Sequence, residues 1–192
     1  MFYLLLGSND ASLMLWNFSK SNQFLSQYAE HDNEVMCLDI CEQDGNIIAS
    51  GSGDTTVRIW DIRKKKSCVR ILEGNSSIVN SVKFVPDSLY TLACAGDDSI
   101  IRLYDIRAFG ELGNYQTADG DRVISLSFSK SGRIIFWGYN NGVINIFDTF
   151  NESLIIGYNN HKSAVKCLAL APDGKSLLST SKDGTINIWQ KK

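Results

Sequence analysis

The sequence predicts an all-β fold of the β-propeller type, and three observations lead to this prediction. Residues 48–61 combine an apolar strand, a tight Gly-Asp turn, a second alternating strand and a terminal Trp-Asp pair. The same pattern recurs four more times along the chain, in residues 4–17, 92–105, 134–148 and 177–190. The aromatic residues that end successive copies lie 42 to 44 positions apart. A period in this range, with four short strands per unit, is typical of propeller blades.

Alternating apolar residues predict four strands in each repeat, which we name a to d from the propeller axis outward. The first strand a is expected at residues 35–40, where charges are few and both faces of the strand should therefore be buried. Strand b follows at 46–51, strand c at 56–60 and strand d at 68–72. Further strands a are expected near 78–84, 122–128 and 164–170. Turns with Gly, Pro, Asp or Ser separate strands a and b, at residues 42–45, 86–88, 130–132 and 172–174.

The chain is expected to begin and end inside a blade. Only strands b, c and d are predicted before residue 31, at 1–7, 12–16 and 23–28, and only a, b and c after residue 160. We therefore expect a single propeller segment over residues 1–192 with four to five blades, which belongs to a larger ring. The expected units are a partial blade at 1–29, blades at about 31–72, 75–117 and 120–157, and a partial blade at 160–190.

Composition and charge favour a protein partner over nucleic acid or a membrane. The formal net charge is −2, so no strong overall field attracts polyanions. No apolar run approaches the roughly 18 residues that a membrane span needs. The five cysteines show no CxxC spacing, which indicates reduced core residues in a cytoplasmic protein rather than a disulfide framework or a metal site. Neither a metal nor another cofactor is expected.

Two repeats share four polar positions: a His before strand a, a Ser in strand b, an Asp in the b-to-c turn and a Trp in strand c, with the last three at equal offsets. These residues are His31, Ser50, Asp54 and Trp60 in one repeat, and His161, Ser179, Asp183 and Trp189 in the other. We expect each set to form a buried chain of hydrogen bonds from Trp through Ser and His to Asp. Other repeats replace the set, with Asn75, Cys94, Asp98 and Tyr104 in one and Asn141 and Phe147 in the next.

A Ser-His-Asp hydrolase triad is the alternative interpretation of these sets. It is disfavoured because the sets recur once per repeat and include a Trp, which has no part in activating a nucleophile. The sequence also lacks a nucleophile elbow. The two sets are therefore predicted to be structural, and the protein is not expected to be an enzyme.

Three segments carry more detail than a propeller repeat requires. They are Gly-Asp-Thr-Thr at 53–56, Ile-Arg-Leu-Tyr-Asp-Ile-Arg-Ala at 101–108 with Glu111-Leu112 after it, and Ser-Phe-Ser-Lys-Ser-Gly-Arg at 127–133. These segments resemble the WD40 repeat family and, within it, the β subunit of heterotrimeric G proteins. The resemblance runs through essentially the whole chain. It implies that the chain corresponds to the C-terminal four blades or so of a seven-bladed ring.

The resemblance also implies a binding face. In that family, the face formed by the d-to-a loops and the b-to-c turns, which we call the top face, binds the G-protein α subunit and, after its release, effectors. Met36, Asn80 and Asp97 match contact residues of that face, and Glu34 keeps an acid where the family has Asp. Lys182 stands where the family has an aromatic residue, so a charge replaces an apolar anchor. Asp97 is one of two adjacent acids, and one of the pair is expected to be free for a partner.

By this resemblance the chain is a non-enzymatic scaffold in GTPase-linked signal transduction. The γ subunit would bind through parts that these residues lack, and the inner face of the plasma membrane would be reached through partners. The alternative is a WD40 scaffold of another complex, such as a ribosome-associated or assembly platform. The basic turn Arg63–Lys66 has two interpretations, a solvated loop or a contact with phosphate or lipid headgroups. The sequence leaves open which α subunit or effector binds, and whether the chain folds or closes alone.

Overall fold

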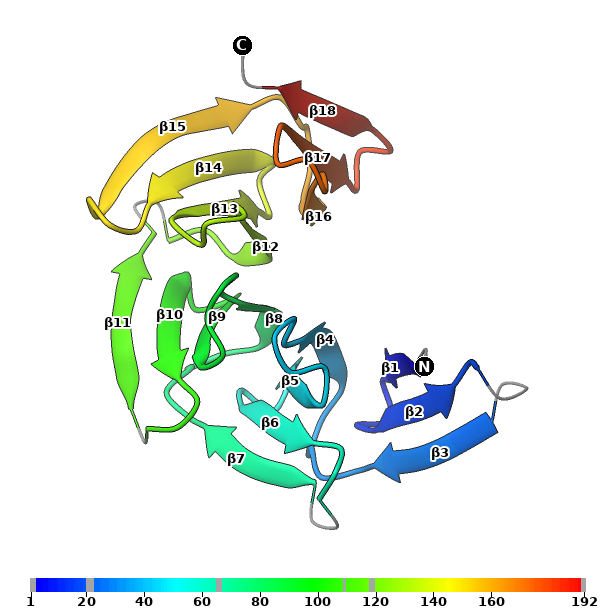
Figure 1. Cartoon of the computed structure of the whole chain (residues 1–192). Helices are drawn as coiled ribbons and strands as arrows, with labels where there is room; N and C mark the ends of the chain where they lie inside the picture. The colour runs from blue at the N-terminus through cyan, green and yellow to red at the C-terminus, as the bar shows by residue number, and fades with distance from the viewer. Residues whose placement is uncertain (1–2, 20–22, 65–66, 109, 118–119, 191–192) are drawn as a thin grey trace.

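Eighteen β-strands and no helix are found in the residues that the structure describes, which are 3–19, 23–64, 67–108, 110–117 and 120–190 of a computed structural model. The strands form five antiparallel sheets that follow chain order (Figure 1). The first and last sheets have three strands each, and the three sheets between them have four.

Each sheet is built from strands that are consecutive in the chain. The first two sheets contain β1 (Tyr3–Gly7), β2 (Leu13–Asn17) and β3 (Gln23–Tyr28), then β4 (Val35–Ile40), β5 (Ile47–Ser52), β6 (Val57–Asp61) and β7 (Cys68–Leu72). The third and fourth contain β8 (Val79–Phe84), β9 (Thr91–Gly96), β10 (Ile100–Asp105) and β11 (Glu111–Gln116), then β12 (Val123–Phe128), β13 (Ile134–Tyr139), β14 (Val143–Asp148) and β15 (Ser153–Asn159). The last sheet contains β16 (Val165–Leu170), β17 (Ser176–Ser181) and β18 (Ile186–Gln190).

The sheets are arranged as an arc around a common centre. In Figure 1, β4, β8, β12 and β16 lie nearest the centre, and β7, β11 and β15 lie at the outer rim. Within the described residues, no ladder of hydrogen bonds joins the first sheet to the last. The strands nearest the centre in Figure 1 correspond to the predicted strands a, and those at the outer rim correspond to the predicted strands d.

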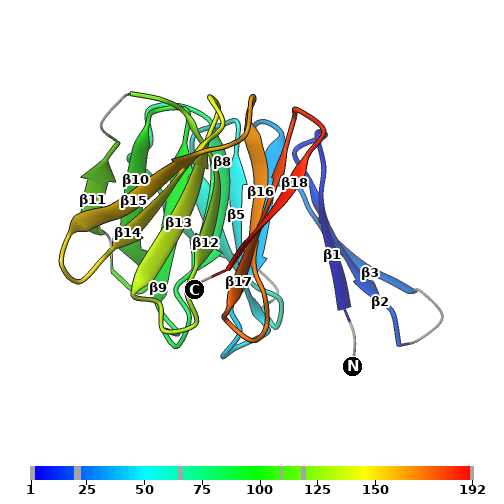
Figure 2. The same cartoon turned by 90° about the horizontal axis from the view of Figure 1, so that it is seen from above.

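Loops gather on two opposite faces, at the two ends of the strands (Figure 2). On the top face, the b-to-c turn of the second to fifth sheets donates a backbone hydrogen bond of 2.9–3.0 Å to the loop before strand a, from Gly53 to Glu34, Asp97 to Ile78, Asn140 to Arg122 and Lys182 to Ala164. On the bottom face, the c-to-d loop donates to the a-to-b turn in the same way, from Ile62 to Asn46, Ile106 to Tyr90 and Thr149 to Arg133. These sheets therefore hold their own loops in place at both ends.

Apolar side chains fill the spaces between neighbouring sheets. Trp60 is fully buried between the first and second sheets, where it packs with Leu13, Val35 and Ile48. Burial of one such side chain contributes roughly 1.5–3 kcal/mol. The inner strands are also tied directly, since Ser125 Oγ–H of β12 donates to the Val165 carbonyl of β16 at 3.0 Å. The arc is therefore one continuous packed body.

The b-to-c turns require left-handed backbone at the same place in every sheet. The φ angles are +67° at Ala11, +72° at Thr55, +63° at Ser99, +95° at Gly142 and +83° at Gly184. At Gly142 a side chain is excluded twice, because a Cβ would also lie 2.3 Å from the His161 carbonyl oxygen of the next sheet. That glycine is required by a close approach as well as by its φ angle.

The predicted strand ends agree with the structure to within one residue, apart from residues 1–2, which lie outside the described part. The all-β fold built of four-stranded antiparallel sheets is confirmed. The number of blades in a complete ring stays a prediction.

Candidate functional site

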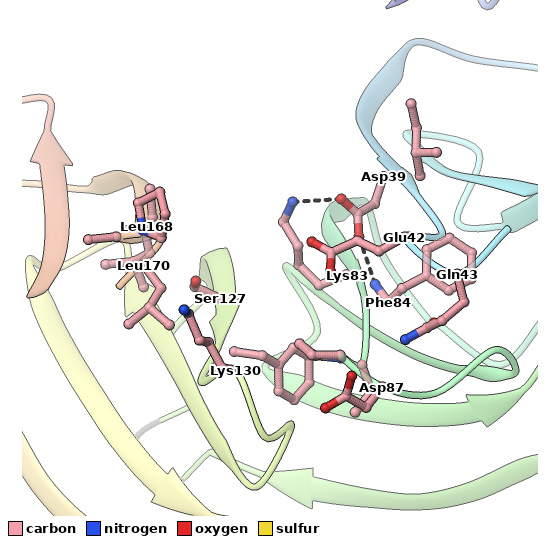
Figure 3. A pocket seen from close by; sticks show the side chains of 17 residues that line it. Asp39, Glu42, Gln43, Lys83, Phe84, Asp87, Ser127, Lys130, Leu168 and Leu170 are labelled. Atoms are coloured by element: carbon pink, nitrogen blue, oxygen red, sulfur yellow. Dashed lines mark hydrogen bonds and ion pairs between the residues drawn. The ribbon is translucent and has the colours of Figure 1, made fainter. Parts of the chain in front are cut away.

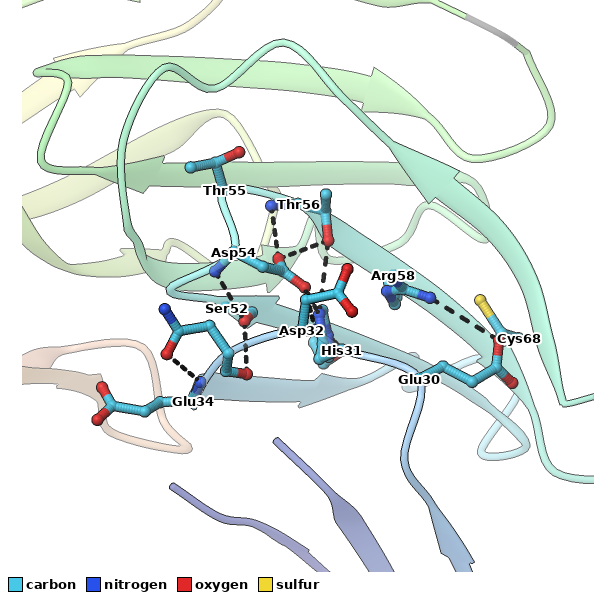
Figure 4. Close-up of polar contacts among 12 residues, drawn as sticks. Glu30, His31, Asp32, Glu34, Ser52, Asp54, Thr55, Thr56, Arg58 and Cys68 are labelled. Atoms are coloured by element: carbon cyan, nitrogen blue, oxygen red, sulfur yellow. Dashed lines mark hydrogen bonds and ion pairs between the residues drawn. The ribbon is translucent and has the colours of Figure 1, made fainter. Parts of the chain in front are cut away.

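A chain of hydrogen bonds crosses the second sheet and ends on the top face. Trp60 Nε1–H donates to Ser50 Oγ at 2.8 Å, and the Ser50 hydroxyl donates to His31 Nε2 at 2.7 Å. His31 Nδ1–H then donates to Asp54 Oδ2 at 2.7 Å (Figure 4). Burial lowers the pKa of His31, so the imidazole is neutral at pH 7, which fits this direction of proton donation.

Asp54 is the outer end of this chain and also closes the b-to-c turn. Its Oδ1 accepts the N–H and Oγ1–H of Thr56 at 2.9 and 2.7 Å, and its Oδ2 accepts the N–H of Asp32 at 3.1 Å. Burial alone would raise the pKa of Asp54, but the hydrogen bonds from Thr56 and His31 outweigh it and lower the pKa to about 2. The ionised carboxylate therefore holds the turn and the loop before strand a together.

The last sheet carries the second predicted set in a looser form. Trp189 Nε1–H donates to Ser179 Oγ at 2.9 Å, and Ser179 lies 2.7 Å from His161 Nε2. The nearest partner of His161 Nδ1 is Thr185 Oγ1 at 2.9 Å, whereas Asp183 Oδ2 lies at 3.3 Å. The hydrogen bond from the Thr185 hydroxyl is the main cause that lowers the pKa of Asp183. Thr185 is therefore closer to the His than the Asp is, whereas in the second sheet Asp54 is closer to His31 than Thr56, which lies at 3.5 Å.

In the third sheet Asn75 takes the place of the His, and it binds an arginine that was not predicted from the sequence. Arg102 is 6% exposed, and its Nη1 donates to Asp98 Oδ2 at 2.6 Å and to Asn75 Oδ1 at 3.1 Å. Its Nε lies 3.3 Å from Glu111. Cys94 stands at the Ser position and lies 3.3 Å from Asn75 Oδ1. The signal was in the sequence, since Arg102 lies four residues after the turn aspartate, on the same strand c.

The fourth sheet fills the same space with aromatic rings. Trp137 of β13 occupies the Ser position, and Phe147 of β14 occupies the Trp position, with ring centroids 5.4 Å apart. Tyr115 packs on Phe147 at 4.7 Å from the neighbouring sheet. Trp137 Nε1 is buried without a hydrogen-bond partner among the described residues. An aromatic residue on strand b has thus been added to the one on strand c, and the polar set is lost.

The polar sets are poorly placed for catalysis. Ser50 and Ser179 are both 0% exposed, so neither hydroxyl can reach a substrate from solvent. Burial raises the pKa of the Cys37 and Cys94 thiols to about 12, which leaves them unreactive at neutral pH. Among the described residues, no group of three or more His, Cys, Asp or Glu side chains could hold a metal ion. The hydrogen bonds of the polar sets link buried strands to the loops of the top face.

Residues of the top face are presented by a β-bulge that recurs in every strand a. The pairing register shifts between Val35 and Cys37, and at the corresponding places in β8, β12 and β16. The residues inside the four bulges are Met36, Asn80, Ile124 and Lys166. A bulge bends the strand and re-aims its side chain, which is a recurrent device beside functional sites. Of these equivalent positions, only Met36 and Asn80 were predicted from the sequence as partner-binding residues.

Comparison with known proteins identifies the repeat. The family model described as "WD domain, G-beta repeat" matches residues 22–61, 66–105 and 152–190, which together make up more than half of the chain. The chain belongs to the WD40 repeat family. The predicted resemblance to this family is confirmed, and the two polar sets lie largely in repeats that the family model matches.

Curated relatives of this WD40 chain include G-protein β subunits. It is 33% identical to a guanine nucleotide-binding protein subunit beta of Solanum tuberosum and 34% identical to those of Oryza sativa subsp. japonica and Arabidopsis thaliana. Each match covers 97% of this chain and 52% of the relative. The chain therefore spans about half the length of the curated relatives it matches.

The predicted partner-binding residues of this WD40 chain all lie on the top face, but they differ in solvent exposure and in their hydrogen bonds to one another. Glu34 and Lys182 are not buried, and Met36 is 44% exposed. Asn80 and Asp97 instead bind each other, since Asn80 Nδ2–H donates to Asp97 Oδ1 at 2.7 Å. These five residues therefore do not form one uniformly open surface.

The expectation that one of the adjacent acids is free for a partner was wrong for Asp97. Its second oxygen lies 3.3 Å from Arg122 Nη1, and its side chain is only 17% exposed. Asn80 also donates to the Val123 carbonyl at 3.0 Å, so the cluster joins the third and fourth sheets. The other acid, Asp98, is held by Arg102. Arg122 was missed because it lies in the loop before β12, outside any repeated motif.

The basic turn on the bottom face is largely neutralised where the structure describes it. Arg63 pairs with Asp61 at 2.8 Å and with Asp44 at 3.0 Å, and Lys64 lies 3.8 Å from Asp61. The remaining residues of the turn, 65–66, lie outside the described part of the chain. The described half of the turn therefore fits the solvated-loop interpretation better than a contact with phosphate.

A cavity of about 700 Å³ opens at the bottom end of the inner strands (Figure 3). Its wall carries an ion pair between sheets, with Lys83 Nζ 2.8 Å from Asp39 Oδ1. The other oxygen of Asp39 accepts the Phe84 N–H at 2.7 Å. These polar groups satisfy one another, so this part of the cavity wall acts as a link between the second and third sheets.

Among the described residues, no helix has the length and apolar character to cross a membrane.

Proposed function

We propose that this chain is a non-enzymatic scaffold of a G-protein β subunit type, which binds a G-protein α subunit or its effectors through the top face. The observation that carries the proposal is the similarity to β subunits over 97% of the chain. The exposure of Glu34 and Met36 at the matched positions supports it. The polar sets of the second and last sheets support it too, because they anchor the loops of that face to the core. In this proposal the chain works in the cytoplasm and reaches the membrane through its partners.

Capture of a purified α subunit on the immobilised chain tests this function. The GDP-bound form is expected to be retained more strongly than the form loaded with a non-hydrolysable GTP analogue. Changing Met36→Ala together with Glu34→Lys is expected to weaken capture about tenfold, because exposed apolar and charged contacts at one face are lost together. Asp87→Ala, in an a-to-b turn of the bottom face, is the matched control and is expected to leave capture unchanged. Equal capture of both nucleotide forms would contradict the proposal.

The second candidate is a WD40 scaffold that serves another complex. Two observations favour it: Lys182 places a charge where an apolar anchor is expected, and Arg122 already occupies Asp97. In that case the top face still binds a protein, but capture of the α subunit does not depend on the nucleotide. The same capture experiment therefore separates the two candidates.

A further inference from the structure

Four cations gather on the top face of the fourth and fifth sheets, and we call them the cationic patch. They are Arg122 before β12, Lys162 in the loop before β16, Lys166 in the bulge of β16 and Lys182 in the b-to-c turn of the last sheet. Hydrogen bonds from backbone N–H groups hold these loops on one face. Lys162 N–H donates to the Asp183 side chain at 2.7 Å, Lys182 N–H donates to the Ala164 carbonyl at 2.9 Å, and the Arg122 carbonyl accepts the Asn140 N–H at 3.0 Å. The positions of the four cations are therefore fixed by the fold.

Three of the four cations of the patch are not paired with an acid. Lys162, Lys166 and Lys182 reach solvent and form no ion pair within the described residues. Asp183 is committed to the turn, where it accepts the hydroxyl and the N–H of Thr185 at 2.6 and 2.9 Å. The ammonium groups of these three lysines thus face solvent, and Asp183 is directed at the turn and at the Lys162 N–H rather than at any of them.

Arg122 extends the patch toward the third sheet. Its side chain is 63% exposed although it lies 3.3 Å from Asp97. The neighbouring Asp121 is engaged by the amide of Asn141. The guanidinium therefore keeps donors that can meet a second carboxylate in the fork geometry that arginine favours.

The other half of the top face has the opposite charge. Asp10 in the first sheet and Asp32 and Glu34 in the second are all exposed. Between the two halves, the bulge positions carry Met36, Asn80 and an intermediate Ile124, which are uncharged. A polyanion such as a nucleic acid or an anionic membrane would be repelled by the acidic half if it covered the whole face. A folded protein with segregated charges fits both halves.

We infer that the cationic patch binds an acidic segment of the protein partner that docks on the top face. The inference deepens the proposed function and rests on it in one respect, namely that the top face is the binding face. The apolar bulge residues beside the patch supply contact area, and the cations select the partner's acidic end. Lys182 then acts as part of a charge-selective site in place of an apolar anchor.

Fluorescence anisotropy with a short glutamate-rich peptide tests the patch without an α subunit. The whole chain is expected to bind this peptide, and Lys166→Glu with Lys182→Glu is expected to weaken binding about tenfold. Lys130→Glu with Lys175→Glu reverses two lysines of bottom-face turns on the same two sheets, and it is expected to change binding little. The chain's affinity for the peptide should also fall as salt is raised. Thermal melting of all variants verifies that they are folded.

Two further arms decide between sources of negative charge. Vesicles of phosphatidylserine and phosphatidylcholine in equal parts and a single-stranded oligothymidylate are offered to the same chain. Tighter binding of either probe than of the peptide would overturn the inference, and so would equal losses in the two double variants. If the peptide binds through the patch while the α subunit is not captured, the proposed function fails and the acidic-segment inference stands.

Discussion

The second and fourth sheets share one fold but have different interiors. In the second sheet, Trp60 of strand c donates a hydrogen bond to Ser50 of strand b at 2.8 Å. In the fourth, Trp137 takes the place of the serine, and its ring packs on Phe147 with centroids 5.4 Å apart. Strand pairing is the same in both. The blade therefore needs this space to be filled, and either a polar chain or stacked rings can fill it.

The two interiors differ in what they do for the top face. In the second sheet the hydrogen-bond chain continues through His31 to Asp54, so it ties a loop and a turn to the buried core. In the fourth sheet the corresponding link is a side-chain hydrogen bond at the surface, between Asn141 and Asp121. The polar interior is thus a device that fixes loops, whereas the aromatic interior contributes packing alone. Variants in the two sheets can separate these contributions.

The largest effect is expected for Ser50→Ala. The substitution leaves Trp60 Nε1–H and His31 Nε2 unpaired in a fully buried position, and each orphaned group costs about 1–3 kcal/mol. We expect the free energy of unfolding to fall by about 2–4 kcal/mol in urea denaturation. Ser179→Ala, where Trp189 is partly exposed, should cost less. A loss of less than about 0.5 kcal/mol for Ser50→Ala would mean that the hydrogen-bond chain contributes no stability beyond that of side-chain packing.

Asp54→Ala is expected to cost about 1–3 kcal/mol, because the carboxylate that binds His31, Thr56 and the Asp32 N–H is removed. The melting temperature should fall clearly. Asn141→Ala, at the corresponding turn of the fourth sheet, should change it by much less, since that side chain is exposed. An unchanged melting temperature in Asp54→Ala would remove the basis for a structural role.

A smaller effect is expected from pH, and only for the polar interior. The pKa of His31 is lower in the folded chain than its ordinary value, so the unfolded chain binds more protons. The stability that neutral His31 contributes is therefore complete well above pH 6.5, the ordinary pKa, and decreases as the pH falls below it. Denaturation at about pH 7.5 and about pH 5.5 should show this decrease in the original chain. A His31→Gln variant should be less stable at the higher pH but should vary less between the two values.

Much of the fold followed from the sequence because its signals repeat. The Gly-Asp turn before Val57 and the alternation in each strand recur at a nearly constant spacing, so independent copies support one another. The polar set around His31 was equally visible because its Ser, Asp and Trp keep their offsets in the last repeat. The sheets in which other residues replace the polar set were harder to predict. Trp137, for example, stands at a serine position, and there it looks like any other apolar core residue of a strand. The engagement of Asp97 by Arg122 could not be foreseen, because it depends on how two neighbouring sheets pack.

The smallest effect, and the sharpest test of the comparison, is expected for Trp137→Phe. Its Nε1 has no hydrogen-bond partner among the described residues, so the substitution removes a buried orphan donor together with part of the ring. Removal of the orphan donor stabilises the folded chain, and loss of part of the ring destabilises it. The two effects nearly cancel, so the free energy of unfolding should change by less than about 1 kcal/mol. Trp60→Phe removes the same atoms from a tryptophan that is bonded to Ser50, and it should cost about 2 kcal/mol or more. Equal losses in the two variants would show that ring volume alone matters, and the distinction between polar and aromatic interiors would then have no energetic content.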